Sequence, residues 1–163
     1  MLDSNSSNKW RGRIIRYAPL ILWVAVIFTA SSTAGASQNT SMIIRPLLEW
    51  LFPDASIATL DLYHGYIRKL AHFTEYGVLG FLAARAFWYS AQPVLRRFWF
   101  VWAFLFVASV AALDEYNQSF NTLRTASAYD SLIDISGGLF AILVYYAWFE
   151  MRLRKSKSPN KTA

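Results

Sequence analysis

Two segments of the chain gather side chains that can hold charge or exchange protons. The first, residues 69–76, reads KLAHFTEY, and its polar members recur at helical spacing, so they share one helix face. An imidazole can act as a general acid or base beside a carboxylate, and an ammonium group attracts phosphate or carboxylate. The candidate site residues of this segment are Lys69, His72, Glu75 and Tyr76.

The second segment, residues 114–118, reads DEYNQ, and further polar residues follow it before the last apolar run. Asp114 and Gln118 are four residues apart, as are Asp130 and Asp134, so each pair shares a helix face. Carboxylates can accept protons or bind a divalent metal, and arginine attracts anions. We assign no catalytic role and no metal here. The candidates are Asp114, Glu115, Gln118, Arg124, Ser127, Asp130 and Asp134.

Taken singly, these residues also have structural explanations. Ser127 followed by Asp130 fits a helix start, where a hydroxyl caps free amides and an acid meets the helix dipole. Arg124 can neutralise a nearby acid, Lys69 can anchor a helix at the membrane interface, and a single histidine such as His72 is more often structural than a ligand. Their convergence on one side of a membrane, argued next, favours a functional site.

Four apolar runs must position these residues. The chain is 55% hydrophobic, 17% aromatic and only 16% charged, which is typical of an integral membrane domain. About 20 apolar residues suffice for a helix to cross the bilayer. The runs at about 17–36, 70–93, 98–117 and 131–150 therefore predict an all-α, integral membrane four-helix bundle. Small residues allow helices to approach closely, and we expect such contacts at Gly77, Gly80, Gly137 and Gly138.

The distribution of Lys and Arg predicts the orientation. They concentrate before the first run, between the second and third, and after the fourth, whereas most acids lie on the other side. We therefore expect residues 1–13 to form a cytoplasmic tail, residues 14–150 the membrane domain, and residues 151–163 a basic cytoplasmic tail. This N-in, C-in multi-pass arrangement in the plasma membrane would bring the polar candidates to the extracytoplasmic face. Residues 34–36, AGA, also resemble a signal-peptidase site, so cleavage of the first segment is an alternative that leaves the remaining topology unchanged.

An amphipathic extracytoplasmic segment is predicted between the first two spans. Apolar residues recur at helical spacing over residues 42–52 around Arg45 and Glu49. We expect Pro46 in the first turn of this helix and Pro53 to end it. Such a helix would lie on the outer leaflet or pack as a lid on the spans.

Charge and cysteine content exclude two broad classes. The net charge of +6 comes from residues at the chain ends and in one short loop, which does not indicate nucleic-acid binding. The absence of cysteine excludes disulfides, thiolate catalysis and Cys-type metal sites. The expected partners are membrane lipids, and an oligomer is compatible with the sequence.

Several motifs together resemble the VanZ-like family of small membrane proteins. They are KLAHFTEY at 69–76, DEYNQSF at 114–120, RTASAYD at 124–130 and DISGG at 134–138, with Ser31 and Ser32 ending the first span. The resemblance covers about residues 14–150. Residues 121–123, NTL, stand where the family usually has a Pro-Gly-like turn, so the family's loop shape is not carried over. The resemblance implies a four-helix multi-pass envelope protein, related to a protein linked to resistance against a lipid-tailed glycopeptide antibiotic. It implies neither a reaction nor a cofactor.

Three functions compete on these grounds. The favoured hypothesis is a non-enzymatic protein whose outer-face site binds a lipid headgroup, a cell-wall precursor or an amphiphilic compound. The alternative is a membrane-embedded enzyme acting on a lipid or isoprenoid headgroup, with His72 as acid or base. A transporter is the third hypothesis. It is less favoured because the polar residues are predicted on one face of the membrane, whereas transporters bind their substrate near the middle of the bilayer.

Overall fold

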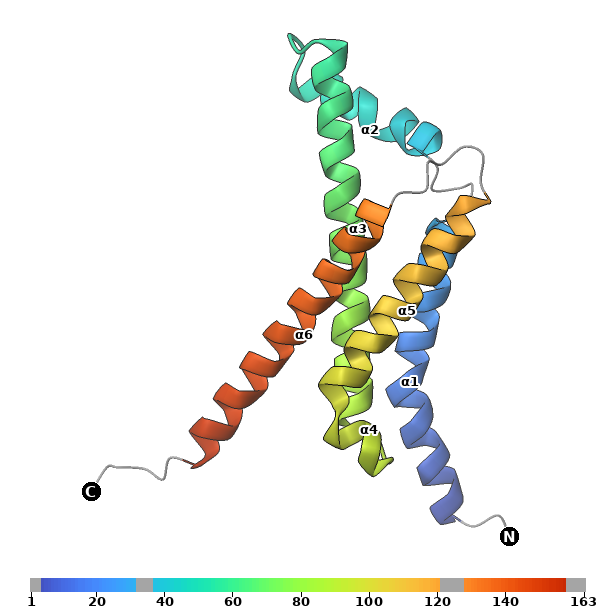
Figure 1. Ribbon diagram of the computed structural model, residues 1–163, viewed down its shortest axis with the longest axis vertical. Coiled ribbons are helices and arrows are strands. Elements are labelled where there is room, and N and C mark those ends of the chain that lie inside the picture. Colours follow the sequence, from blue (N-terminus) through green and yellow to red (C-terminus); the bar gives the residue numbers. More distant parts are fainter. Residues whose placement is uncertain (1–3, 32–36, 121–127, 158–163) are drawn as a thin grey trace, which may run out of the picture.

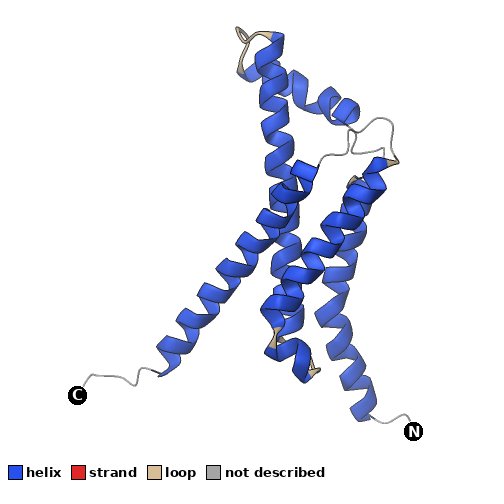
Figure 2. Ribbon diagram, viewed as in Figure 1, coloured by secondary structure: helices blue, strands red, loops and turns tan. Residues whose placement is uncertain are grey.

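The computed structural model describes residues 4–31, 37–120 and 128–157 (Figure 1). The described residues contain helices and no strand, as Figure 2 shows, and this confirms the all-α prediction. The helices are α1 (Ser4–Ala30), α2 (Ser37–Leu51), α3 (Ile57–Trp88), α4 (Pro93–Arg97), α5 (Trp99–Ser119) and α6 (Ala128–Lys157).

Helix α3 is the centre of the molecule and packs on α1, α2, α4, α5 and α6. Its largest interface is with α6, where glycines allow the two backbones to approach. A Cβ atom at Gly80 would collide with the backbone of Gly138, and one at Gly137 would collide with the backbone of Phe73. The predicted role of these glycines as close helix contacts is therefore confirmed.

An aromatic cluster joins α3, α5 and α6 at the end of the bundle that holds α4. Trp88 lies against Phe149, with ring centroids 3.9 Å apart, and against Trp99 at 5.5 Å. Trp99 also contacts Tyr145 edge-on at 5.7 Å. The start of α1, helix α4 and the end of α6 all lie at this end, whereas α2 and the start of α3 lie at the opposite end (Figure 1).

Among the described residues, three helical segments are long and apolar enough to cross a membrane: Trp10–Ala30, Trp99–Ser119 and Tyr129–Arg152. The predicted run 98–117 starts one residue before the segment Trp99–Ser119, and the run 131–150 lies inside the segment Tyr129–Arg152. The first predicted run, about 17–36, overlaps α1, whose apolar part is Trp10–Ala30. Residues 32–36 of that run lie outside the described residues. Helix α3 is not among the three, so its crossing stays a prediction.

The second predicted run, about 70–93, lies mostly within α3 (Ile57–Trp88), which is longer than the run at its start. Helix α3 begins at Ile57 rather than at residue 70, because Ser56 caps it: the Ser56 hydroxyl accepts a hydrogen bond of 3.2 Å from the Thr59 amide. It ends at Trp88, and Pro93 instead begins the short helix α4. The predicted run marks only the apolar part of this helix, and a helix can continue into water beyond the membrane at no cost in hydrogen bonds.

The amphipathic segment is helical as expected and ends at Leu51, just before Pro53. The placement of Pro46 in its first turn was wrong, because α2 starts at Ser37 and Pro46 lies well inside it. Among the described helices α2 packs on α3 alone, and it buries Leu48 while Ile43 and Trp50 stay exposed. Such exposure of apolar side chains is typical of a helix at a membrane surface.

Candidate ligand-binding site

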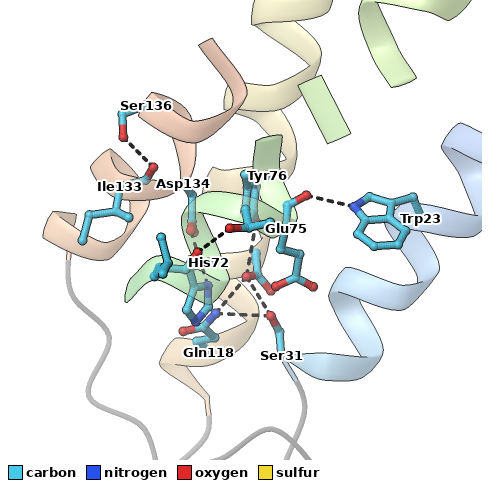
Figure 3. A network of polar contacts seen from close by, with 12 residues as sticks. Trp23, Ser31, His72, Glu75, Tyr76, Gln118, Ile133, Asp134 and Ser136 are labelled. Carbon is cyan, nitrogen blue, oxygen red and sulfur yellow. Dashed lines mark hydrogen bonds and ion pairs between the residues drawn. The ribbon is translucent and has the colours of Figure 1, made fainter. Parts of the chain in front are cut away.

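A buried polar network surrounds the carboxyl group of Asp114 on α5. Its Oδ2 atom accepts hydrogen bonds from the Ser31 hydroxyl at 2.8 Å, the Gln118 amide nitrogen at 2.8 Å and the Tyr76 hydroxyl at 3.3 Å (Figure 3). The Asp114 and Tyr76 side chains are fully buried, and Ser31 and Gln118 are also buried. The network therefore joins the end of α1 to α3 and α5 in a buried layer.

The network is not saturated by the residues that the structure describes. Asp114 Oδ1 is buried and accepts no hydrogen bond from any of them. A buried polar atom without a partner costs about 1–3 kcal/mol, so the three donors on Oδ2 must stabilise the group. The stability of the buried Asp114 carboxyl group therefore depends on its three hydrogen bonds.

A second polar pair links α3 to α6. His72 Nδ1 lies 3.4 Å from Asp134 Oδ1, and the two side chains are 20% and 5% exposed. A carboxylate on the Nδ1 side favours a proton on that nitrogen and fixes the orientation of the ring. The approach of these two atoms is an ion-pair contact without the geometry of a hydrogen bond.

A cavity of about 130 Å³ opens between α3 and α6 beside this pair. No ion pair joins Arg68, Lys69 or Asp130 to another residue in the described part of the chain, although the Lys69 ammonium lies 5.7 Å from the centre of the Tyr129 ring. The cavity therefore presents charges of both signs that are not paired with one another. Its lining residues are Gly65, Arg68, Lys69, His72, Asp130 and Ile133.

An open apolar groove of about 530 Å³ adjoins the cavity on the side of α3 that faces α1. The Trp23 indole nitrogen donates a hydrogen bond of 2.9 Å to the Glu75 carbonyl and so holds the two helices together beside the groove (Figure 3). The lining residues are Trp23, Ile67, Leu70, Ala71, Thr74, Glu75 and Val78. Glu75 is thus the one acidic residue among otherwise apolar or neutral groups there.

The structure divides the candidates predicted from the sequence into groups. Tyr76, Asp114 and Gln118 meet in the buried network, while His72 and Asp134 form the pair beside the cavity. Lys69, His72 and Asp130 line the cavity, and Glu75 lines the groove. Glu115 is half-buried and lines neither concavity. Arg124 and Ser127 lie outside the described residues.

Three contributors were not among the predicted site residues. Ser31 had been noted only as the end of the first span, yet it donates to Asp114. Arg68 precedes Lys69 and lies four residues before His72, a spacing that could have identified it. Trp23 gave no signal beyond its aromatic character. Within the described residues no group of three or more His, Cys, Asp or Glu could hold a metal ion.

Comparison with known proteins identifies the family of the chain. Residues 17–150 match the VanZ/LLP1 family, a region that includes every candidate site residue. The chain belongs to the VanZ-like family. No curated protein and no solved structure matches it. The matched region includes the described residues of the Asp114 network and those that line the cavity between α3 and α6.

Proposed function

We propose that this VanZ-like membrane protein binds the polar headgroup of a membrane amphiphile in the cavity between α3 and α6. The ligand would be a lipid headgroup, a cell-wall precursor or an amphiphilic compound of the lipoglycopeptide type. A role in the cell envelope, and through it in antibiotic resistance, would follow from capture of such molecules at the outer leaflet.

The observation that carries the proposal is the unpaired charge in this cavity. Arg68 and Lys69 face a concavity without an ion-pair partner in the described residues, at one end of a set of apolar helices. Charged groups near a hydrocarbon boundary are costly unless they are paired. A phosphate or carboxylate of a bound headgroup would supply that pairing through charge-assisted hydrogen bonds.

The predicted topology places this cavity at the outer membrane interface. Helix α3 has 32 residues and is therefore about 48 Å long, more than the roughly 30 Å of the hydrocarbon core. We propose that its part from about Lys69 to Trp88 is a fourth span and that its first turns stand outside the cell. The exposed residues Arg11, Arg13, Arg96 and Arg97 lie at the other end of the bundle, which supports a cytoplasmic position for that end.

Binding can be tested on the full protein in lipid nanodiscs by native mass spectrometry of the lipids it retains. Arg68→Gln/Lys69→Gln should reduce retained phospholipid by about tenfold or more, because two charge-assisted contacts are lost. Arg96→Gln/Arg97→Gln is the matched control, since it removes the same charge from exposed residues of α4. Equal retention by both double variants would refute the proposed site. Arg124 and Ser127 remain predicted members on sequence grounds, and Arg124→Ala belongs in the same series.

A second candidate function is a membrane-embedded enzyme acting on a lipid or isoprenoid headgroup. The specific observation is the His72–Asp134 pair, in which a buried carboxylate lies 3.4 Å from an imidazole that lines the cavity. The other ring nitrogen of such a histidine can accept a proton from water or a hydroxyl group. The test is a comparison of the envelope lipids of three strains, which contain the wild-type protein, no protein, or the His72→Gln variant at the wild-type level. A species that changes with the wild type and reverts with His72→Gln would show catalysis, and identical lipid profiles would count against it.

A further inference from the structure

The charges that line the cavity are of two signs, and their positions restrict the headgroup. Arg68 and Lys69 come from consecutive positions on α3, whereas Asp130 comes from the first turn of α6. Both signs are unpaired within the described part of the chain. A purely anionic headgroup would satisfy the two cations but would leave its negative charge near the Asp130 carboxylate. A headgroup that carries both a phosphate and an ammonium group would satisfy both sides.

The size of the cavity limits what it can hold. Pockets that enclose a whole drug-sized ligand measure about 300–1,000 Å³. The cavity of about 130 Å³ is too small for an entire amphiphile and fits a compact polar group. The remainder of the ligand must lie outside it.

The groove between α1 and α3 is the nearest place for that remainder. It borders the cavity along α3, because Arg68 and Ala71 lie three residues apart, as do His72 and Glu75, and residues at this spacing are neighbours on a helix surface. The groove residues on α3 run from Ile67 to Val78, which is about 17 Å along the helix axis. Its walls are mostly apolar, so a hydrocarbon chain can lie along it beside Trp23.

We propose that the ligand is a phospholipid with a primary amine in its headgroup, held with its phosphate at Arg68 and Lys69, its ammonium at Asp130, and an acyl chain in the groove along α3. This inference rests on the proposed function and specifies its ligand. A primary ammonium donates hydrogen bonds to a carboxylate, whereas a trimethylated ammonium cannot. Asp130 would therefore favour phosphatidylethanolamine over phosphatidylcholine, although the two headgroups carry the same charge.

The headgroup is tested with the full protein in nanodiscs of equimolar phosphatidylethanolamine, phosphatidylcholine and phosphatidylglycerol, with the retained lipids measured by native mass spectrometry. The wild type should retain phosphatidylethanolamine about tenfold over phosphatidylcholine, the factor expected for one charge-assisted hydrogen bond. Asp130→Asn should abolish this preference. The matched control, Asp61→Asn, removes an exposed acid from α3 that does not line the cavity and should keep it.

The contribution of the acyl chain to binding is tested with Ala71→Phe, whose larger side chain fills the groove. The control is Ala147→Phe, at an exposed position of α6. Only Ala71→Phe should reduce retention. The chain-free headgroup glycerophosphoethanolamine should compete weakly; if it competes as well as the lipid, the groove plays no part and that element is refuted.

Failure of this inference can be distinguished from failure of the proposed function. Equal retention of all three lipids, still abolished by Arg68→Gln/Lys69→Gln, would overturn the amine-bearing ligand and leave the headgroup site intact. Retention that is insensitive to Arg68→Gln/Lys69→Gln would overturn both. A preference for phosphatidylethanolamine that survives Asp130→Asn would overturn the assigned role of Asp130.

Discussion

The hydroxyl group of Ser31 donates a hydrogen bond of 2.8 Å to Oδ2 of Asp114, across 83 positions of the chain. This contact joins the end of α1 to a fully buried carboxyl group on α5. Helix α1 otherwise makes few contacts with α5 and packs mainly on α3. The Ser31–Asp114 bond is therefore a principal link between the first helix and the buried network.

Replacement of Ser31 tests this link. Ser31→Ala should destabilise the folded protein by about 1–2 kcal/mol, because the buried Asp114 carboxyl group loses one of its three donors. The measurement is the thermal unfolding midpoint of purified protein in detergent. Ser109→Ala on α5 is the matched control, since the Ser109 hydroxyl is exposed and donates to the Leu105 carbonyl of its own helix. A shift of the same size in both variants would contradict the structural role of Ser31.

The glycine contact between α3 and α6 makes a second prediction. Gly80→Ala places a Cβ atom against the Gly138 backbone, so the two helices must separate. We expect a destabilisation of about 1–3 kcal/mol, as for overpacking in a close interface. Gly12→Ala is the control, because a Cβ atom there meets nothing within 4 Å and a helical alanine is intrinsically favoured over glycine. The thermal unfolding midpoint should fall for Gly80→Ala and rise for Gly12→Ala. A stabilised Gly80→Ala protein would show that the two helices do not meet at this position.

Periodicity and hydropathy predicted much of the helical framework. The predicted run 98–117 agrees with α5 (Trp99–Ser119), and the glycines that allow close contacts were recognised because small residues have few other uses in apolar helices. The start of α3 was missed because hydropathy reports the part of a helix in lipid and not its continuation into water. The interior position of Pro46 was missed because its placement relied on the usual preference of proline for a first turn.

The site was predicted as a single polar layer, but the structure separates it into a buried network and an open cavity. Helical spacing indicates which residues share a face, and this correctly grouped Asp114 with Gln118. It does not indicate which helices face each other, so neither the Ser31 contact nor the pairing of His72 with Asp134 could be derived. The spacing of Arg68 from His72 placed it on the same face of the helix, but its position beside a cavity depends on how α6 crosses α3.

The His72–Asp134 pair makes a prediction about energetic coupling. If the two side chains act as a unit, His72→Gln and Asp134→Asn should each destabilise the protein, and the double variant should be little worse than the more damaging single one. A double-mutant cycle of thermal unfolding would give a coupling energy of about 0.5–3 kcal/mol. The control cycle joins His72→Gln with Ser136→Ala, because the exposed Ser136 hydroxyl donates only to the Ile133 carbonyl of its own helix. Additive effects in both cycles would show that the 3.4 Å approach carries no energy.

The membrane crossing of α3 can be tested directly, because the chain contains no cysteine. Asp61 and Tyr89 are exposed and lie near opposite ends of α3, so single cysteines at these positions report on its two ends. An impermeant thiol reagent should label Asp61→Cys in intact cells and Tyr89→Cys only after permeabilisation. This pattern follows from the concentration of arginine at the end of the bundle that holds α4. Labelling of both in intact cells would show that α3 does not cross, and the reverse pattern would place the cavity on the cytoplasmic side, where an outer-leaflet ligand could not reach it.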